Sequence, residues 1–337
     1  MNMSAKIKAF GEVMMRLEVP NYLKLEQTRN LNVSYSGTGV NVLSALSRFG
    51  HQTSLITKLP ANSVGDAAIA NIRSLGISTD DIVRGGDYVG LYFLEKGFHV
   101  RSTKVTYSNR QESSFCTSTL EDFPIASILK NTNMIHFCGI SLAISENIRE
   151  MTIEIARQAK QLGITIIFDC NYRPKLWNNE YMIARQSYME MVKLADICFM
   201  SKRDAQFLLG MEEDDDSNLS KVEELLKIVA DEYDIQTIAC TIRKERENLI
   251  LQGFIYHDGA TCLSKEYVYK TLDRIGAGDG FASGIIHGLI HHFPIDEMIE
   301  FSTAASVLAH TTYGDTPVCS AEEIWSLVHQ DMVDIER

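Results

Sequence analysis

The 337-residue sequence has no uninterrupted apolar run of membrane length, and its first residues include no apolar stretch long enough for a secretory signal. Its seven cysteines are scattered singly, without a pair at metal-binding or redox spacing, so we expect reduced and mostly buried thiols. Basic residues are in deficit, since 32 Lys and Arg stand against 44 Asp and Glu, giving a formal net charge of −12. That charge argues against nucleic acid or an anionic membrane as the main partner. We therefore expect a cytoplasmic protein that binds neither.

Two familiar nucleotide-binding patterns are also missing. The P-loop, with its Lys-Ser/Thr pair, occurs nowhere in the chain. The dinucleotide fingerprint Gly-x-Gly-x-x-Gly starts at Gly276 and Gly278 but fails at its third glycine, where Phe281 stands. The sequence therefore predicts neither a dinucleotide site nor a P-loop.

What the chain does contain is a regular alternation of strand and helix patterns. Apolar strand patterns at 5–13, 53–58, 134–138 and 164–168 are separated by amphipathic helix patterns that end at glycines (Gly50, Gly76 and Gly163). This alternation predicts a single α/β domain over residues 1–337, with a mostly parallel central sheet flanked by helices.

Two segments break the alternation. Short β-rich runs between about 86 and 116 follow one another without a helix, and further extended pieces lie between 14 and 36. Together they predict a small antiparallel sheet that forms a lid over an active site. Exposed strands of such a lid would favour a homodimer formed there.

The chemistry is concentrated in residues 273–281, where Gly276, Gly278 and Gly280 alternate with Ala277 and Asp279 ahead of a helix pattern. Glycines at a helix start allow a close backbone approach, and the unpaired N–H groups and helix dipole favour an anion. A carboxylate inside such a cradle suits one task, which is to take a proton from a hydroxyl that attacks phosphorus. The alternative is that Asp279 only caps the helix.

These features resemble those of the PfkB-type (ribokinase-like) carbohydrate kinases over nearly the whole chain. Asp273 with the segment 276–279 resembles the C-terminal signature of that family, and Gly37 with Asn41 resembles its N-terminal sugar-binding motif. Within the family, the loop 169–177, Arg274 and the segment 309–315 are similar to those of 2-keto-3-deoxygluconate kinases.

The resemblance implies a ribokinase-like fold and an enzyme that uses ATP and Mg²⁺ to phosphorylate the primary hydroxyl of 2-keto-3-deoxygluconate. Asp279 would be the general base, and backbone N–H groups of Gly276, Ala277 and Gly278 would form the anion hole. The nucleotide would contact Thr241, Arg243, Gly276, Gly278 and Ser306. Asp169 and Asp204 would be the candidate metal ligands, although capping or loop positioning suits Asp169 equally.

The expected substrate contacts are Gly37, Asn41, Tyr92, Tyr107, Arg110, Arg173 and Asp315. Arg110 and Arg173 would hold a substrate carboxylate through paired hydrogen bonds, and their alternative is a solvated surface position. For Tyr92 and Tyr107 simple sheet packing is an equal alternative, and for Asp315 capping of the last helix is.

Two other functions stay open at this point. One is a kinase of the same family for a neutral sugar such as fructose or ribose, and the more distant one is a non-catalytic sugar sensor. His291 and His292 fall near an expected helix end, where a cation is favourable. Because no cysteine or acid pattern accompanies them, we do not interpret them as metal ligands.

Overall fold

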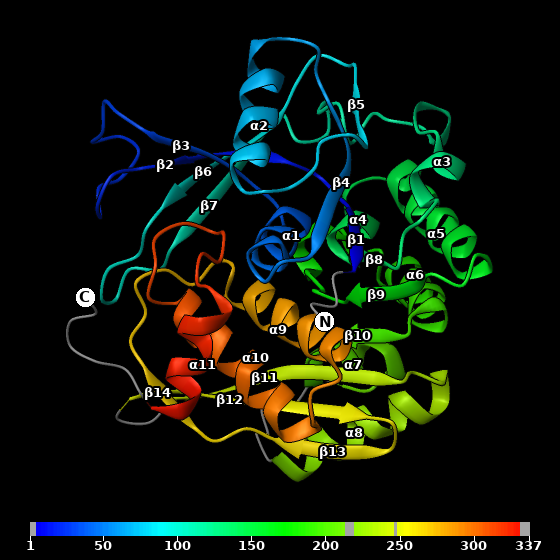
Figure 1. Cartoon of the computed structure of the whole chain (residues 1–337). Coiled ribbons are helices and arrows are strands. Elements are labelled where there is room, and N and C mark those ends of the chain that lie inside the picture. The colour runs from blue at the N-terminus through cyan, green and yellow to red at the C-terminus, as the bar shows by residue number, and fades with distance from the viewer. Residues whose placement is uncertain (1–4, 213–218, 246–247, 331–337) are drawn as a thin grey trace.

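The computed structural model describes residues 5–212, 219–245 and 248–330 (Figure 1). Its larger sheet has the strand order β13-β12-β11-β10-β9-β8-β1-β4-β5, with β14 paired to β12. The bounds of these strands are β1 (Lys6–Phe10), β4 (Gln52–Leu59), β5 (Ile82–Arg84), β8 (Met134–Cys138), β9 (Thr165–Asp169), β10 (Ile197–Phe199), β11 (Thr237–Glu245), β12 (Leu249–His257), β13 (Ala260–Leu263) and β14 (Tyr267–Tyr269).

Parallel pairing extends from β5 through β1 to β11, and β12, β13 and β14 add antiparallel pairs at one edge. The middle strands are apolar on both faces because helices cover both sides, as in parallel sheets generally. The predicted mostly parallel α/β fold is confirmed.

One face of the large sheet carries α1 (Thr38–Arg48), α2 (Ser63–Ser74), α9 (Ala277–His291) and α10 (Ile295–Ala309), while α11 (Ala321–His329) packs on α10. The other face carries α3 (Ile125–Leu129), α4 (Ile140–Ile144), α5 (Glu146–Gln161), α6 (Tyr181–Leu194), α7 (Lys202–Leu209) and α8 (Leu219–Tyr233), and two 3₁₀ turns, η1 (Leu120–Asp122) and η2 (Pro174–Leu176), lie in loops. The glycines that predicted helix ends come immediately after the C-cap residues of α1, α2 and α5 and have positive φ angles.

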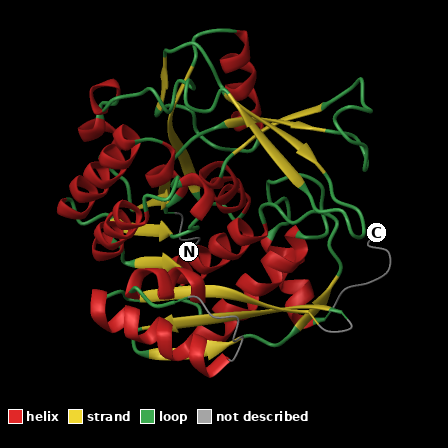
Figure 2. Ribbon diagram, turned by 180° about the vertical axis from the view of Figure 1, so that it is seen from behind, coloured by secondary structure: helices red, strands yellow, loops and turns green. Residues whose placement is uncertain are grey.

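The smaller sheet has the order β3-β2-β6-β7 and stands apart from the larger one in Figure 2. Its strands are β2 (Met14–Glu18), β3 (Asn32–Ser36), β6 (Gly90–Glu95) and β7 (Lys104–Ser108), all inside the two segments in which a small sheet was expected. The outer pairs are antiparallel, whereas the central pair β2–β6 is parallel because the two segments enter the sheet in the same direction.

The seven cysteines are all free, and five of them are buried. Within the described ranges, no helix combines the length and the apolar character needed to cross a membrane.

Candidate active site

A cleft of about 730 Å³ lies between the carboxyl ends of the strands of the large sheet and the small sheet. Parallel sheets commonly bind ligands at this edge. Most of the residues expected in the site line the cleft: Gly37, Asn41, Tyr92, Tyr107, Arg110, Asp169, Arg173, Asp204, Thr241, Arg243, Gly276, Gly278, Asp279 and Asp315.

Two expected residues do not belong to the cleft lining. Ala277 is the first residue of α9 and is fully buried. Ser306 is buried inside α10, where its carbonyl accepts a hydrogen bond from Nδ1 of His310 at 2.8 Å. The nucleotide contact expected at Ser306 therefore has no support from the geometry.

Two glycine turns bring the starts of α1 and α9 together at the floor of the cleft. Gly276 adopts a left-handed conformation (φ 86°), and a Cβ atom there would come within 1.7 Å of the Asp315 carbonyl oxygen. A Cβ at Gly37 would come within 2.3 Å of the Glu12 carbonyl oxygen. Across this junction, Nδ2 of Asn41 donates to Oδ2 of Asp279 at 2.7 Å, so the two motifs, 238 residues apart, meet in one hydrogen bond.

The carboxylate of Asp279 is not a helix cap, because Gly276 holds the N-cap position of α9 and no side chain caps that helix. Burial raises the pKa of Asp279 to about 7, against the lowering effects of the Asn41 hydrogen bond and the Arg173 charge. A carboxylate with a pKa in this range can take up a proton at neutral pH, as a general base must.

Asp169, the last residue of β9, lies near Asp279, and Asp204 lies in the first turn of α7, the helix that follows β10. Burial raises the pKa of Asp169 to about 8, and repulsion from Asp279 and Asp204 adds to the increase. Asp204 is held differently, because its carboxylate accepts hydrogen bonds from the Ser201 backbone N–H (2.8 Å), the Ser201 hydroxyl (2.5 Å) and the Tyr172 N–H (3.2 Å). Asp204 therefore caps α7, while Asp169 has far fewer donors.

The two arginines expected to clamp a carboxylate both reach the cleft, in different states. Arg173 is exposed just before η2, and its charge lowers the pKa of Asp169 and Asp279. Arg110 is largely buried, and its Nε donates to Oε2 of Glu12 at 2.8 Å. The guanidinium lies over the Tyr107 ring, 4.8 Å from the centroid, and its buried Nη1 has no hydrogen-bond partner.

Sequence reasoning missed two charged groups near the start of the chain, Glu12 in the loop after β1 and Arg16 on β2. Arg16, only 1% exposed, forms ion pairs with Asp273 (3.1 Å), Glu18 and Asp315. The sequence did contain a signal for Arg16. In a strand, Arg16 shares a face with the apolar Met14, and an arginine on a buried face requires charged partners.

Asp315 and Tyr92 join this network. Oδ2 of Asp315 accepts hydrogen bonds from the Ser36 hydroxyl at 2.7 Å and the Tyr92 hydroxyl at 2.5 Å. The capping alternative for Asp315 is excluded, since Ser320 caps α11. The ring of Tyr92 is buried, whereas that of Tyr107 is 49% exposed at the rim.

Comparison with known proteins agrees with this geometry. A 2-dehydro-3-deoxygalactonokinase from Haloferax volcanii is 27% identical over 99% of this chain and 100% of its own length. A 2-dehydro-3-deoxygluconokinase structure from Thermotoga maritima superimposes with a TM-score of 0.92 at 32% identity, covering 97% of this chain and 98% of that one. A structure from Enterococcus faecalis, provisionally assigned as a 2-keto-3-deoxygluconate kinase, has a TM-score of 0.94 at 38% identity over 99% of both chains.

The family model described as pfkB family carbohydrate kinase matches residues 4–322, which include both glycine turns and the whole cleft lining. The resemblance seen in the sequence motifs is thereby confirmed. The chain belongs to the pfkB family of carbohydrate kinases.

Proposed function

We propose that the protein transfers the terminal phosphoryl group of ATP to the primary hydroxyl of 2-keto-3-deoxygluconate, giving the 6-phosphate. The observation that carries this proposal is the hydrogen bond between Asn41 and Asp279, which joins the sugar-binding motif to the base in one cleft. The relatives named for 2-keto-3-deoxy sugar acids support the substrate class.

In this mechanism Asp279 accepts the proton of the sugar hydroxyl while Asn41 fixes the orientation of the carboxylate. The backbone N–H groups at the start of α9 face the phosphoryl group as negative charge develops on it. Gly276 and Gly278 keep this turn free of side chains, so the phosphate can approach the backbone. The remaining phosphates would extend toward Thr241 and Arg243 on β11, which line the same cleft.

Magnesium fits the acidic side of the cleft, because Mg²⁺ prefers carboxylate oxygens. Asp169 is the better candidate ligand, since its carboxylate lies among other carboxylates and a cation would relieve their repulsion. The carboxylate of Asp204 already accepts hydrogen bonds from Ser201 in the capping box of α7. It would therefore attract the ion by its charge rather than bind it directly. When bound, the ion neutralises charge on the transferring phosphoryl group.

The substrate carboxylate would be held by Arg110 and Arg173. The unpartnered, buried Nη1 of Arg110 is a donor that a carboxylate can satisfy, which supports an acidic substrate. One observation favours the alternative of a neutral sugar such as fructose or ribose: Arg110 is already paired with Glu12, so the pair brings no net charge to the cleft.

The small sheet would act as a lid, because Tyr92 and Tyr107 line the cleft from its strands. Its edge strands β3 and β7 expose apolar side chains, Val33 at 58% and Val105 at 40%. We therefore expect a homodimer that covers these edges. Light scattering should give a dimer mass, and V33E/V105E should give a monomer; a monomeric parent protein would exclude this interface.

The function is tested by measuring ADP release from ATP with 2-keto-3-deoxygluconate, its 2-keto-3-deoxygalactonate epimer, fructose and ribose. We expect the largest kcat/KM on the keto-deoxy acids. Larger kcat/KM on a neutral sugar would replace the proposed substrate. Sugar binding by calorimetry without ADP release would favour the sensor.

A further inference from the structure

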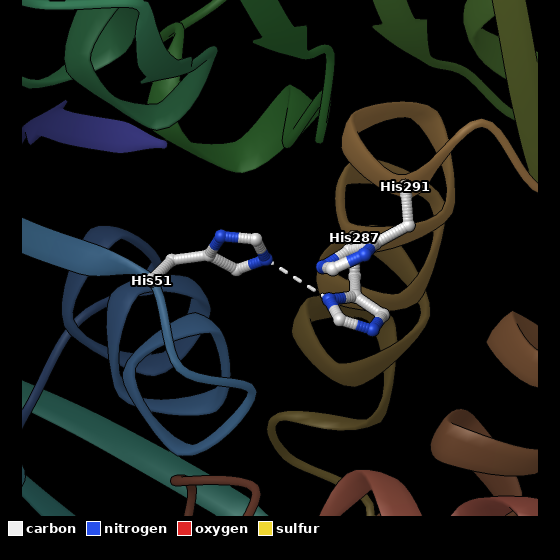
Figure 3. Close-up of side chains that lie close together, drawn as sticks. All are labelled: His51, His287 and His291. Carbon is white, nitrogen blue, oxygen red and sulfur yellow. Dashed lines mark hydrogen bonds between the residues drawn. The ribbon is translucent and has the colours of Figure 1, made fainter. Parts of the chain in front are cut away.

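Three histidines meet at the end of α9 opposite the cleft (Figure 3). His51 lies between α1 and β4, whereas His287 and His291 are four residues apart and so share one face of α9. One nitrogen from each of the three rings lies within 4.8 Å of the other two. In the described parts of the chain, no other set of three histidine, cysteine or acidic residues is grouped in this way.

The rings are held in place by their surroundings. His51 and His287 are 5% and 6% exposed, and Nε2 of His51 and Nδ1 of His287 share a hydrogen bond of 2.9 Å. The His287 ring packs between Phe49 and Phe301, with centroid distances of 5.0 and 5.4 Å. The other ring nitrogen of His51, Nδ1, accepts a long hydrogen bond of 3.4 Å from the Ala5 N–H.

Metal binding uses imidazole in its neutral form, which has a lone pair available on one ring nitrogen. The half-buried His291 leaves one side of the cluster open to solvent, through which an ion can enter.

The distances agree with this chemistry. A zinc ion about 2.0–2.1 Å from each nitrogen places tetrahedral ligand atoms roughly 3.3 Å apart. Nε2 of His51 and Nδ1 of His287 are 2.9 Å apart, and one nitrogen from each of the three rings lies within 4.8 Å of the other two. Small ring rotations therefore bring the three nitrogens to the spacing that zinc requires. For the ion to enter, His51 must give up its hydrogen bond with His287. It must also give up the long, 3.4 Å contact in which its Nδ1 accepts from the Ala5 N–H.

We propose that His51, His287 and His291 form a binding site for a zinc-type transition-metal ion, with water as the fourth ligand. The site is separate from the proposed magnesium position, because Mg²⁺ takes oxygen ligands and imidazole prefers Zn²⁺, Co²⁺ or Ni²⁺. A cation is also favoured at the carboxyl end of α9 by the helix dipole.

Such an ion would fasten α9 to the junction of α1 and β4. The same two helices are already joined at the cleft by the bond between Asn41 and Asp279. Metal binding would therefore fix the position of α9 at the end opposite Asp279. We expect the Tm of the protein to rise as the metal concentration rises.

The test uses the full chain, treated with a chelator and then freed of it, and titrated with Co²⁺. We expect one equivalent to give the intense visible absorption of tetrahedral cobalt, which Zn²⁺ displaces and excess Mg²⁺ does not. Absence of this signal, or its loss on adding Mg²⁺, would overturn the proposal, since the latter outcome assigns the ion to the acidic cleft.

Variants locate the site. His291→Asn changes the half-buried ligand and should weaken Co²⁺ binding by more than the roughly 10–100-fold typical of losing an outer-shell partner. His51→Gln should do the same. The matched control is His292→Asn, because His292 is exposed and left-handed (φ 54°), a conformation that asparagine tolerates. Wild-type affinity in folded His291→Asn, or an equal loss in His292→Asn, would contradict the assignment.

Discussion

The small-sheet end of the cleft, where we propose that the sugar binds (the sugar end), and the opposite end, where we propose that the phosphates bind (the phosphate end), hold their carboxylates in opposite ways. At the small-sheet end, Glu12 faces Arg110, and both Asp273 and Asp315 face Arg16. At the other end, Asp169 lies within the influence of the Asp279 and Asp204 charges, and burial and repulsion raise its pKa. The first end is organised before any ligand arrives, whereas the second is completed by the cation and phosphates that we propose it binds.

The substitution with the largest expected effect on the phosphate end is Asp279→Asn. The amide keeps the shape of the side chain but cannot accept the proton, so kcat should fall by about 10²–10⁴-fold. Sugar affinity, measured by calorimetry, should stay within a few-fold because the Asn41 side remains intact. Near-normal turnover would remove Asp279 from the role of base.

The corresponding change at the sugar end is Arg16→Met, which should affect stability rather than chemistry. It leaves Asp273 and Asp315 buried without their main partner, and we expect the free energy of unfolding to fall by about 3–5 kcal/mol. Denaturant titration measures this loss. The control Arg157→Met breaks an exposed pair with Glu190 and should cost about 1 kcal/mol or less. Equal losses in both variants would contradict the buried network.

Arg110→Gln tests whether the sugar end recognises charge. A lost charge-assisted hydrogen bond of about 1.5–3 kcal/mol should lower kcat/KM for the keto-deoxy acid roughly 10–100-fold. Because the variant leaves Glu12 unpaired, the double variant E12Q/R110Q separates loss of the clamp from loss of folding. An equal decrease on a neutral sugar would show that Arg110 only supports the fold.

Asp169→Asn tests whether a cation completes the phosphate end. The Mg²⁺ concentration for half-maximal rate should rise at least roughly tenfold, as for loss of an outer-shell partner or more. Asp204→Asn is the comparison, and we expect a smaller rise because that carboxylate caps α7. An unchanged Mg²⁺ requirement in Asp169→Asn would exclude this ligand.

The smallest expected effect is a shift in pH dependence. A carboxylate accepts a proton only when it is ionised, so if Asp279 is the base, as we propose, kcat/KM should decrease as the pH falls through its pKa of about 7. Because the charge of Arg173 lowers that pKa, Arg173→Gln should move the acid limb to higher pH. Arg110→Gln should leave the limb in place. An unchanged acid limb in Arg173→Gln would show that the charge of Arg173 does not act on the base.

The sequence predicted the sheet and the small second sheet because these depend on local periodicity and glycine positions, and it predicted the segments around the cleft mainly through the resemblance of their motifs to those of a known family. It could not predict the pairing of Arg110 with Glu12, which are 98 residues apart, or the four-part network around Arg16. It could not bring His51 to α9 either, since 236 residues separate it from His287. In each case the decisive fact is which long-range neighbours the fold supplies.

The bond between Ser36 and Asp315 spans 279 residues, and this has a consequence for biosynthesis. Because the chain emerges from the ribosome N-terminus first, Ser36 and Tyr92 cannot form their hydrogen bonds with Asp315 until residue 315 has been synthesised. We therefore expect this side of the proposed sugar pocket to be completed after β3 and β6, which carry Ser36 and Tyr92, have been synthesised. A nascent chain that stops before residue 315 should fail to hold the sugar, however well its sheet has formed.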